Sequence, residues 1–241
     1  MGLQFSNERD KNNKKGYRFL LSLNDEQKSA KAEILNNTIS IILGKAGSGK
    51  TLLACQIALQ EVLQKRRKKI IITRPTISKE DLGHLPGNME EKMSPWVAPI
   101  YGNMYQLLRR ERVDKMIKDG QIEIVPVSFM RGRTFMDSMI IVDEAQNVTH
   151  EQMEMITSRI GLRSKMIICG DAHQTDLKKK SDSGFKFLYT AARKIKNLEA
   201  ITLTTNHRNE IVADLLEYYD SAVERGVSIT TSGSYIYNGK N

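Results

Sequence analysis

The feature that most constrains this chain is the octapeptide "GKAGSGKT", from Gly44 to Thr51, which lies between an apolar run and a helical pattern. It matches G-x-x-x-x-G-K-[ST]; "SIIL" before it predicts a buried strand and "LLACQIAL" after it predicts a helix. In such a strand–loop–helix unit, glycines allow successive backbone N–H groups to point at phosphate oxygens beside the positive end of the helix. The motif therefore predicts a phosphate-binding loop, and a chance Gly-rich turn is a weak alternative with these flanks.

The loop assigns roles by residue type. Lys50 would place its charge on the β- and γ-phosphates and so also assist phosphoryl transfer, and the Thr51 hydroxyl would hold Mg²⁺. The residues expected to surround the phosphates are Gly44, Lys45, Ala46, Gly47, Ser48, Gly49, Lys50, Thr51 and Leu52.

Short apolar segments alternate with helical patterns along most of the chain. The candidate strands are "TISIILG", "KIIITRP", "QIEIVPV", "SMIIVDE", "SKMIICGD" and "LEAITLT". Alternation of this kind predicts an α/β fold with a mainly parallel sheet and helices on both faces. About six strands use up residues 18–225, so we expect one domain there, with 1–17 as a polar, mobile arm and 226–241 as a tail or small hairpin.

Composition narrows the class of protein. Lys and Arg total 37 against 28 acids, a formal charge of +9, which favours a polyanionic partner without proving one. No apolar run approaches the roughly 20 residues of a membrane helix, and the polar start has no signal-peptide core. Cys55 and Cys169 lie inside apolar segments and read as reduced core residues, so we expect a cytoplasmic protein without membrane contact. The four histidines show no metal-ligand spacing and are expected at the surface or in turns.

Two acids follow the strand "MIIV". Asp143 would emerge at the carboxyl end of that strand, where parallel sheets bind ligands, and would act on Mg²⁺ directly or through water. Glu144 is then free to orient and deprotonate an attacking water, which favours hydrolysis over simple binding. The alternative is that both acids cap a following helix near Thr149.

A third polar pair lies in the segment "MIICGDAHQTDL". Asp171 and Gln174 come after a buried strand, and a polar side chain at that edge can contact the γ-phosphate or the attacking water. An ordinary Asp-containing turn is an equally good interpretation of the pattern alone.

Together these motifs carry a family resemblance. "GKAGSGKT", "RPTISKEDLGHLPGNMEEKMSPW", "FMRGRTFMDSMIIVDEAQNVTHEQMEMITSRIG" and "SKMIICGDAHQTDL" resemble the PhoH family of ATPases, in the family's order, over roughly residues 25–219. The combination M-R-G-R-T-[FL] followed by D-E-A-Q-N is far more specific than the phosphate loop. PhoH proteins are similar to the first motor domain of superfamily 1 helicases, in which Gln27 of "LNDEQ" would match the glutamine that reads adenine.

The resemblance implies ATP with a RecA-like P-loop NTPase core, an RNA or single-stranded DNA substrate, and a homo-oligomer, of which a hexameric ring is one form. The chain departs from these relatives in two ways. Superfamily 1 helicases close ATP between two RecA-like domains, whereas this chain holds one. In "LTTNHRNEIV", His207 precedes Arg208, while the common bacterial form has Arg before His, so a role carried over to Arg208 is less secure.

The single motor domain raises the question of which cation meets the charge that develops on the γ-phosphate. An arginine finger is worth about 10³ to 10⁵ in rate, and a neighbouring subunit could supply it. Arg131, Arg133 and Arg208 are the candidates. Arg131 and Arg133 precede the strand that ends at Asp143, so we expect them away from their own subunit's nucleotide, facing a neighbour's site or a nucleic-acid path. Surface charges without a special role are the alternative.

Other cations and aromatics give weaker signals. "KRRKK" at 65–69 would end the helix after the phosphate loop, and a solvated helix end is the simplest interpretation. The segment "LPGNMEEKMSPWVAPIYGNMY" is expected to be a loop whose Trp96, Tyr101 and Tyr105 could stack a base, although core packing is the favoured fate of Trp96.

Three functions compete at this point. The first is a Mg²⁺-dependent ATPase that couples hydrolysis to RNA or single-stranded DNA, with helicase-like activity as one outcome. The second is a nucleotide-gated assembly module that does not move nucleic acid. The third is a small-molecule kinase, which Glu144 directly after Asp143 and the lack of an arginine-rich lid both disfavour.

Overall fold

The computed structural model describes residues 17–75, 89–172, 177, 182–192, 194–207, 211–212, 214–215, 218–219, 221, 227–229 and 235–237, with the backbone alone for 89–95, 227–229 and 235–237. Most of the expected N-terminal arm therefore lies outside the described residues, as do Gln174 and Arg208. Within the described residues, no helix combines the length and apolar character that crossing a membrane requires.

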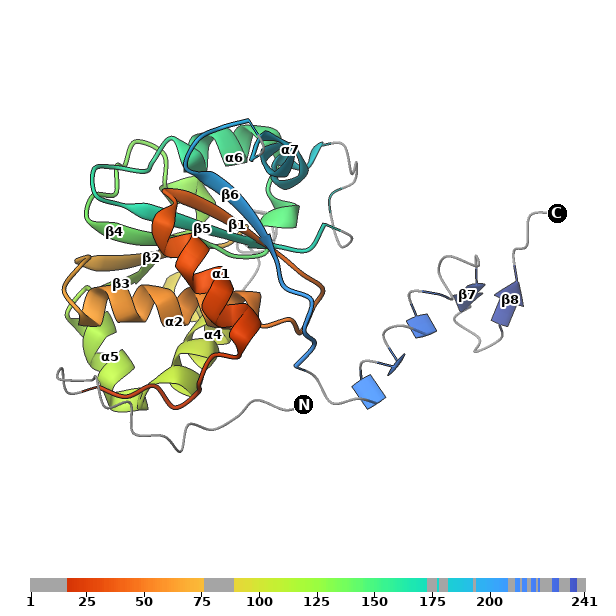
Figure 1. The fold of residues 1–241 in the computed structure, drawn as a ribbon, viewed down its shortest axis with the longest axis horizontal. Coiled ribbons are helices and arrows are strands. Elements are labelled where there is room, and N and C mark those ends of the chain that lie inside the picture. Colours follow the sequence, from red (N-terminus) through yellow and green to blue (C-terminus); the bar gives the residue numbers. More distant parts are fainter. Residues whose placement is uncertain are drawn as a thin grey trace.

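The centre of the molecule is one parallel sheet of six strands (Figure 1). The strands are β1 Ile39–Leu43, β2 Lys69–Thr73, β3 Ile122–Ile124, β4 Ser138–Val142, β5 Lys165–Gly170 and β6 Leu198–Thr202. Their order is β3-β2-β4-β5-β1-β6, and every pairing is parallel. The predicted strands and their parallel arrangement are confirmed.

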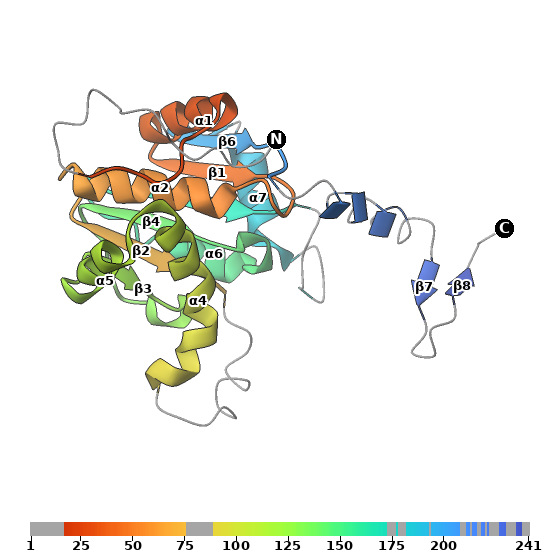
Figure 2. The ribbon, with the colours of Figure 1, turned by 90° about the horizontal axis from the view of Figure 1, so that it is seen from below.

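Helices cover both faces of the sheet (Figures 1 and 2). One face carries α1 Asp25–Asn36, α2 Lys50–Leu63, α4 Met89–Leu107 and α5 Arg110–Lys118, and the other carries α6 His150–Thr157 and α7 Gly184–Ala191. Alternate strand residues divide between the two cores: Ile70 and Ile72 of β2 face the first, and Ile71 faces the second. The strands are largely apolar because both faces of the sheet are buried.

Short elements join these layers. The 3₁₀ turns η1 Val127–Phe129 and η2 Ala145–Asn147 follow β3 and β4. At the end of the chain, β7 Val227–Ile229 and β8 Tyr235–Tyr237 form an antiparallel pair beside the main body (Figure 1). Asn24 is the N-cap of α1: its side chain accepts from the Gln27 amide, and the Gln27 side chain accepts from the Asn24 amide.

From Met89 on, the segment expected to be a loop with stacking aromatics is instead helix α4, so that expectation was wrong there, and residues 85–88 lie outside the described residues. Pro99 removes a helical hydrogen bond, but Ile100, Met104 and Leu107, spaced as one helical face, are fully buried in the core. Core packing outweighs the local cost of proline. The Trp96 indole is half-buried and donates to the Pro75 carbonyl at 3.4 Å.

The basic run at 65–69 also differs from its expected place. Helix α2 ends at Leu63, before the run begins, and Lys65 adopts a left-handed backbone conformation. Arg66 pairs with Glu61, and Lys68 lies 3.6 Å from Asp137. These cations precede β2, so they lie at the amino-terminal edge of the sheet, opposite the phosphate loop.

Candidate functional site

The carboxyl ends of four strands bring the candidate residues to one edge of the sheet. Leu43 at the end of β1 is level with Gly170 of β5 and Thr202 of β6, and Val142 of β4 is level with Ile168. The phosphate loop, Asp143, Asp171 and the segment after β6 therefore all begin at the same edge. Ligands of parallel sheets bind there.

The phosphate loop has the backbone that its glycines predict. Gly47 and Gly49 have φ angles of 90° and 80°, in the left-handed region that L side chains rarely adopt. A Cβ on Gly44 would lie 2.8 Å from the Leu203 carbonyl oxygen, so this position also requires glycine. Gly49 is the N-cap of α2, and its side-chain-free turn leaves the first N–H groups of the helix available to an anion.

Lys50 lies over the loop that it follows. Its Nζ donates to the Gly44 carbonyl at 2.6 Å and to the Lys45 carbonyl at 2.9 Å. The ammonium is thus held above the curled backbone, where a phosphate would enter. When an anion binds, Lys50 would exchange these contacts with carbonyl groups for a charge-assisted hydrogen bond to the anion.

Thr51 and Asp143 form the centre of the site. The Thr51 hydroxyl donates to Asp143 Oδ1 at 2.6 Å, although 92 residues separate them. Asp143 is only 6% exposed. Its burial, together with the charge of Glu144, raises the pKa of this carboxyl, while the Thr51 hydrogen bond acts to lower it. A buried carboxylate beside a hydroxyl is an oxygen pair that a hard divalent cation would stabilise.

Glu144 has an unusual backbone conformation. Its φ and ψ are 51° and 39°, left-handed for a residue with a long side chain. The turn separates its side chain from that of Asp143 and directs it to two partners. Glu144 Oε2 accepts from Gln146 Nε2 at 2.6 Å, and Oε1 lies 3.7 Å from the Arg74 guanidinium. The alternative of helix capping fails, because Thr149 is the N-cap of α6.

Two of these partners were missed in the sequence. Gln146 is buried, and its Oε1 accepts from the Asp171 amide at 3.1 Å, so one side chain links Glu144 to the end of β5. Arg74 follows β2 and brings a cation of the same chain to the site. The "DEAQN" and "TRP" patterns contain both residues, but nothing in their spacing indicates that they meet.

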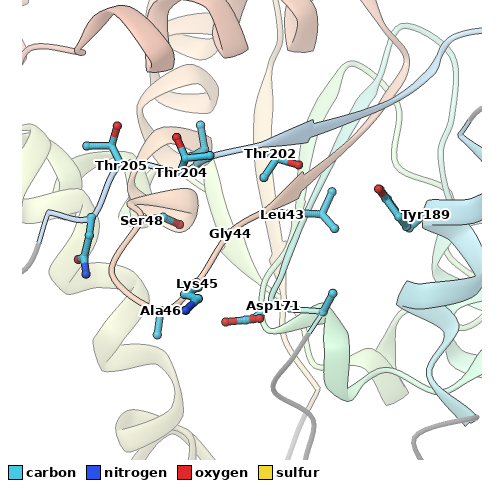
Figure 3. A pocket seen from close by; sticks show the side chains of 13 residues that line it. Leu43, Gly44, Lys45, Ala46, Ser48, Asp171, Tyr189, Thr202, Thr204 and Thr205 are labelled. Atoms are coloured by element: carbon cyan, nitrogen blue, oxygen red, sulfur yellow. The ribbon is translucent and has the colours of Figure 1, made fainter. Parts of the chain in front are cut away.

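A cavity of about 270 Å³ joins these groups. The lining residues are Ala46, Gly47 and Gly49 to Leu52 of the loop and the start of α2, Asn103 of α4, Asp143, Glu144 and Gln146, and Cys169, Gly170 and Asp171 at and just after the end of β5. A larger cavity of about 560 Å³ lies on the α7 side of the loop, between Leu43, Tyr189 and the segment 202–206 (Figure 3). Ala46 and Asp171 line both cavities, and Lys45 lines the larger one.

Gln27 lies beside Gly49 of the loop. Its Nε2 is 3.3 Å from His207 Nε2, and a Cβ added to Gly49 would lie 3.2 Å from the same Gln27 atom. His207 is tied to the loop as well, because its amide donates to the Gly47 carbonyl at 3.1 Å. His207 therefore lies in a loop packed against the phosphate loop, although it lines neither cavity.

The paired arginines occupy another region. Arg133 NH2 lies 2.8 Å from Glu123 Oε1 of β3, and its guanidinium stacks over the Phe135 ring at 4.8 Å. Arg131 is exposed, and Gly132 between them has a φ of 79°. Neither arginine lines the phosphate cavity.

The sheet order, the glycine-bent loop at the start of α2, and the acids after β4 define a P-loop NTPase with a RecA-like sheet. A family model described as PhoH-like protein matches residues 20–220. The PhoH-like protein of Bacillus subtilis (strain 168) is 39% identical over 200 residues, covering 80% of this chain and 62% of that protein. The chain therefore belongs to the PhoH-like protein family. It spans less than two thirds of the Bacillus protein.

A solved structure agrees on the fold. The large terminase of a thermophilic bacteriophage is similar with a TM-score of 0.52 and 11% identity, over 81% of this chain and 50% of that one. The Pif1 helicase of Candida albicans has a TM-score of 0.45 and 18% identity, over 85% and 47% of the two chains.

Proposed function

We propose that this chain is a Mg²⁺-dependent ATPase that acts on RNA or single-stranded DNA as a homo-oligomer. The observation that carries the proposal is the position of Glu144, which lies directly after the Thr51–Asp143 pair and lines the same cavity as Lys50. A carboxylate held there by Gln146 has the position of a general base for a water molecule, and a binding site alone would not need one.

The residues present fit both ligands. The loop bends through Gly47 and Gly49 at positive φ angles and leads into the amino end of α2, which suits phosphate oxygens. Thr51 and Asp143 would hold the cation, and Lys50 the phosphates. A Mg²⁺ ion held there would offset the negative charge of the phosphates. Gln27 is the residue proposed to read adenine, because it flanks the loop beside Gly49.

The proposed hydrolysis uses groups of this chain. Glu144 accepts a proton from water as the water oxygen bonds to the γ-phosphorus and the bond to the β-phosphate oxygen breaks. Lys50 and Arg74 are the nearby cations that would stabilise the departing charge, and Arg133 and Arg208 stay candidates for a contribution from a neighbouring subunit. Gln174 stays a candidate for contact with the γ-phosphate.

The nucleic-acid part of the proposal has its own support. The net charge of +9 favours a polyanion, and the PhoH resemblance points to RNA or single-stranded DNA. The free, buried cysteines Cys55 and Cys169 suit the reducing cytoplasm. Stimulation of phosphate release by single-stranded RNA or DNA is the expected result. Indifference to both would favour the nucleotide-gated assembly module.

The central test replaces Glu144 alone. Glu144→Gln should bind ATP with unchanged affinity while phosphate release falls by about 10²- to 10⁴-fold. Glu151→Gln, at an exposed position on nearby α6, is the matched control and should hydrolyse normally. If Glu144→Gln hydrolyses ATP at the normal rate, Glu144 is not the base.

A further inference from the structure

The amino-terminal edge of the sheet, opposite the phosphate loop, carries a row of cations. The strand register makes the first residues of β2, β4, β5, β1 and β6 level with one another. The segments that lead into β2, β5 and β6 contain five Lys or Arg in 65–69, two in 163–165 and two in 194–197, and no acid. Because neighbouring strands lie about 4.8 Å apart, this row spans roughly 19 Å.

Two acids at this edge offset part of the charge. Glu61 of α2 is buried and forms an ion pair with Arg66. Asp137, before β4, lies 2.6 Å from the Arg163 guanidinium and 3.6 Å from Lys68 Nζ. Within the residues that the structure describes, the cations of the row form no other ion pair. Most of the positive charge is therefore not neutralised by the chain itself.

Arg67 and Lys165 form the half-buried centre of the row. Lys165 begins β5 on the same face as Ile167, toward α2, and its Nζ donates to the Asn37 carbonyl at 2.5 Å. Arg67 Nη1 donates to the Arg66 carbonyl at 2.7 Å. Arg67 Nε is buried and has no acceptor among the described residues. A buried donor without a partner is costly, so this nitrogen calls for a ligand.

The two cations also repel each other. Burial lowers the pKa of the Lys165 ammonium, and the charge of Arg67 lowers it further, although Glu61 acts to raise it. An anion beside the pair would offset this repulsion and offer acceptor oxygens to the guanidinium. Phosphate oxygens fit the planar fork of an arginine, and an ammonium adds a second charge-assisted bond. The centre of the row therefore suits a phosphate group.

A solvated helix end is the simpler role for such cations, and it accounts for part of the row. The amides of Arg66 and Arg67 donate to the Glu61 carbonyl near the end of α2, where positive charge is favourable. That role does not explain why Lys165, which begins a strand 98 residues after Arg67, lies close to it. It also leaves the buried Arg67 Nε without an acceptor.

We propose that this basic edge, defined as the Lys and Arg residues of 65–69, 163–165 and 194–197, binds the phosphate backbone of single-stranded RNA or DNA, with one phosphate at Arg67 and Lys165. A free phosphate ion would occupy the centre alone, whereas a row across four strand spacings suits a polymer of phosphates. The inference rests on the nucleic-acid part of the proposed function, and it assigns the surface. The strand would then lie at the edge of the sheet opposite the nucleotide site.

Direct binding tests the surface without ATP. Fluorescent single-stranded oligonucleotides, RNA in one series and DNA in the other, are titrated with the full chain and followed by anisotropy. Arg67→Gln and Lys165→Gln should each lower the affinity about tenfold, and each should lower the slope of log affinity against log salt by about one. Lys28→Gln and Arg112→Gln, at exposed positions on α1 and α5, are the matched controls and should change both quantities little.

Amine labelling tests the same surface with no substitution, which matters because Arg67 and Lys165 are half-buried and their variants could fold poorly. The wild-type chain is treated briefly with an amine-reactive reagent, with and without the oligonucleotide, and each lysine is quantified by mass spectrometry. Lys65, Lys69 and Lys165 should lose most of their labelling when the oligonucleotide is bound. Lys28 should be labelled equally in both samples.

A third measurement separates the possible sources of the anion. Inorganic phosphate is added at constant ionic strength, and the melting temperature is compared between wild type and the Arg67→Gln/Lys165→Gln double variant. If phosphate stabilises only the wild type while oligonucleotide affinity is the same in both, the site takes free phosphate and the nucleic-acid surface is overturned. If the double variant changes only the mass of the protein in solution, the edge is a protein contact, which also overturns the inference.

The outcomes separate this inference from the proposed activity. Weaker binding in Arg67→Gln and Lys165→Gln together with protection of the edge lysines supports it, whether or not ATP is hydrolysed. Unchanged affinity in both variants, or labelling of the edge lysines that the oligonucleotide does not affect, overturns it. A chain whose ATP hydrolysis is stimulated by single strands, but whose affinity for them does not depend on this edge, overturns the surface and leaves the proposed activity standing.

Discussion

The Thr51 hydroxyl donates to Asp143 Oδ1 at 2.6 Å, joining the first turn of α2 to the end of β4. In a parallel sheet with β5 between β1 and β4, this single bond connects the phosphate loop to the acid that would hold a cation. It also stabilises a carboxylate that burial disfavours, since burial raises the pKa of Asp143 and this bond acts to lower it. The relationship is therefore both structural and functional.

Removing the hydroxyl should cost stability even without ligand. Thr51→Val removes one hydrogen-bond donor from the buried Asp143 carboxylate, and we expect the free energy of unfolding in urea to fall by about 1.5–3 kcal/mol. Thr51→Ser keeps the donor and should lose little. ATP affinity measured with Mg²⁺ and with a chelator should differ clearly in wild type and in Thr51→Ser, but little in Thr51→Val. A Thr51→Val protein with full stability and full Mg²⁺ dependence would contradict this account.

Gln146 is expected to position the Glu144 carboxylate. Its side chain donates to Glu144 and accepts from the Asp171 amide, so Gln146→Leu frees the carboxylate and leaves a buried N–H without a partner. We expect kcat to fall about tenfold, the cost of one lost charge-assisted bond, with KM for ATP nearly unchanged. If Gln146 had a purely structural role, Gln146→Leu would lower the free energy of unfolding and leave the kcat of the folded protein unchanged. Both quantities are therefore measured.

Arg74 competes with Arg133 and Arg208 for the role of the catalytic cation. Its guanidinium is already 3.7 Å from Glu144, whereas Arg133 is engaged by Glu123. We expect Arg74→Ala to lower kcat by about 10- to 100-fold with little change in ATP affinity, and Arg74→Lys to recover part of the loss.

The other two arginines are tested beside it. If Arg133 acts across a subunit interface, Arg133→Ala should lower kcat in the assembled protein, and Glu123→Gln, which releases Arg133, should not. Arg208→Ala is the corresponding change after β6. Normal turnover in all three alanine variants would show that none of these arginines contributes to the transition state.

The sequence predicted the individual elements of this site, but it did not predict which side chains contact one another. The phosphate loop and the strand before Asp143 depend on residues close in the chain, where glycines and apolar runs act directly. Gln146 contacts a backbone group 25 residues away, and Arg74 reaches the site only because β2 lies beside β4. Side-chain partners of this kind depend on strand order, which the pattern of apolar runs does not specify.

At helix α4 the prediction failed for a different reason, because local residue preferences favoured a loop where packing stabilises a helix. Its prolines and glycine favour a loop, yet the burial of Ile100, Met104 and Leu107 against α2 and the sheet stabilises a helix. Burying three large apolar side chains is worth roughly 5–9 kcal/mol, which offsets the roughly 3 kcal/mol that each of the internal prolines Pro95 and Pro99 costs. The covering of one face of the sheet decides the structure of this segment.

Glu26 should make the stability of the folded chain depend on pH. It accepts from both the amide and the hydroxyl of Thr204 and from the Thr205 amide, tying α1 to the end of β6 and so setting Gln27 beside His207. Burial acts to raise the pKa of Glu26, but these hydrogen bonds lower it from 4.5 to about 2. A carboxyl whose folded pKa is depressed adds stability that is complete above its unfolded pKa and is lost as the pH falls through the folded one.

Glu26→Gln should therefore be less stable than wild type at neutral pH, with the difference in unfolding free energy narrowing between pH 4.5 and about 2. Glu33→Gln, an exposed glutamate on the same helix, is the control and should follow the wild-type curve. The free energies come from urea unfolding at several pH values, with helix content as the signal. A gap between Glu26→Gln and wild type that stays constant down to pH 2 would mean that the ionised carboxylate is not what holds α1 to Thr204.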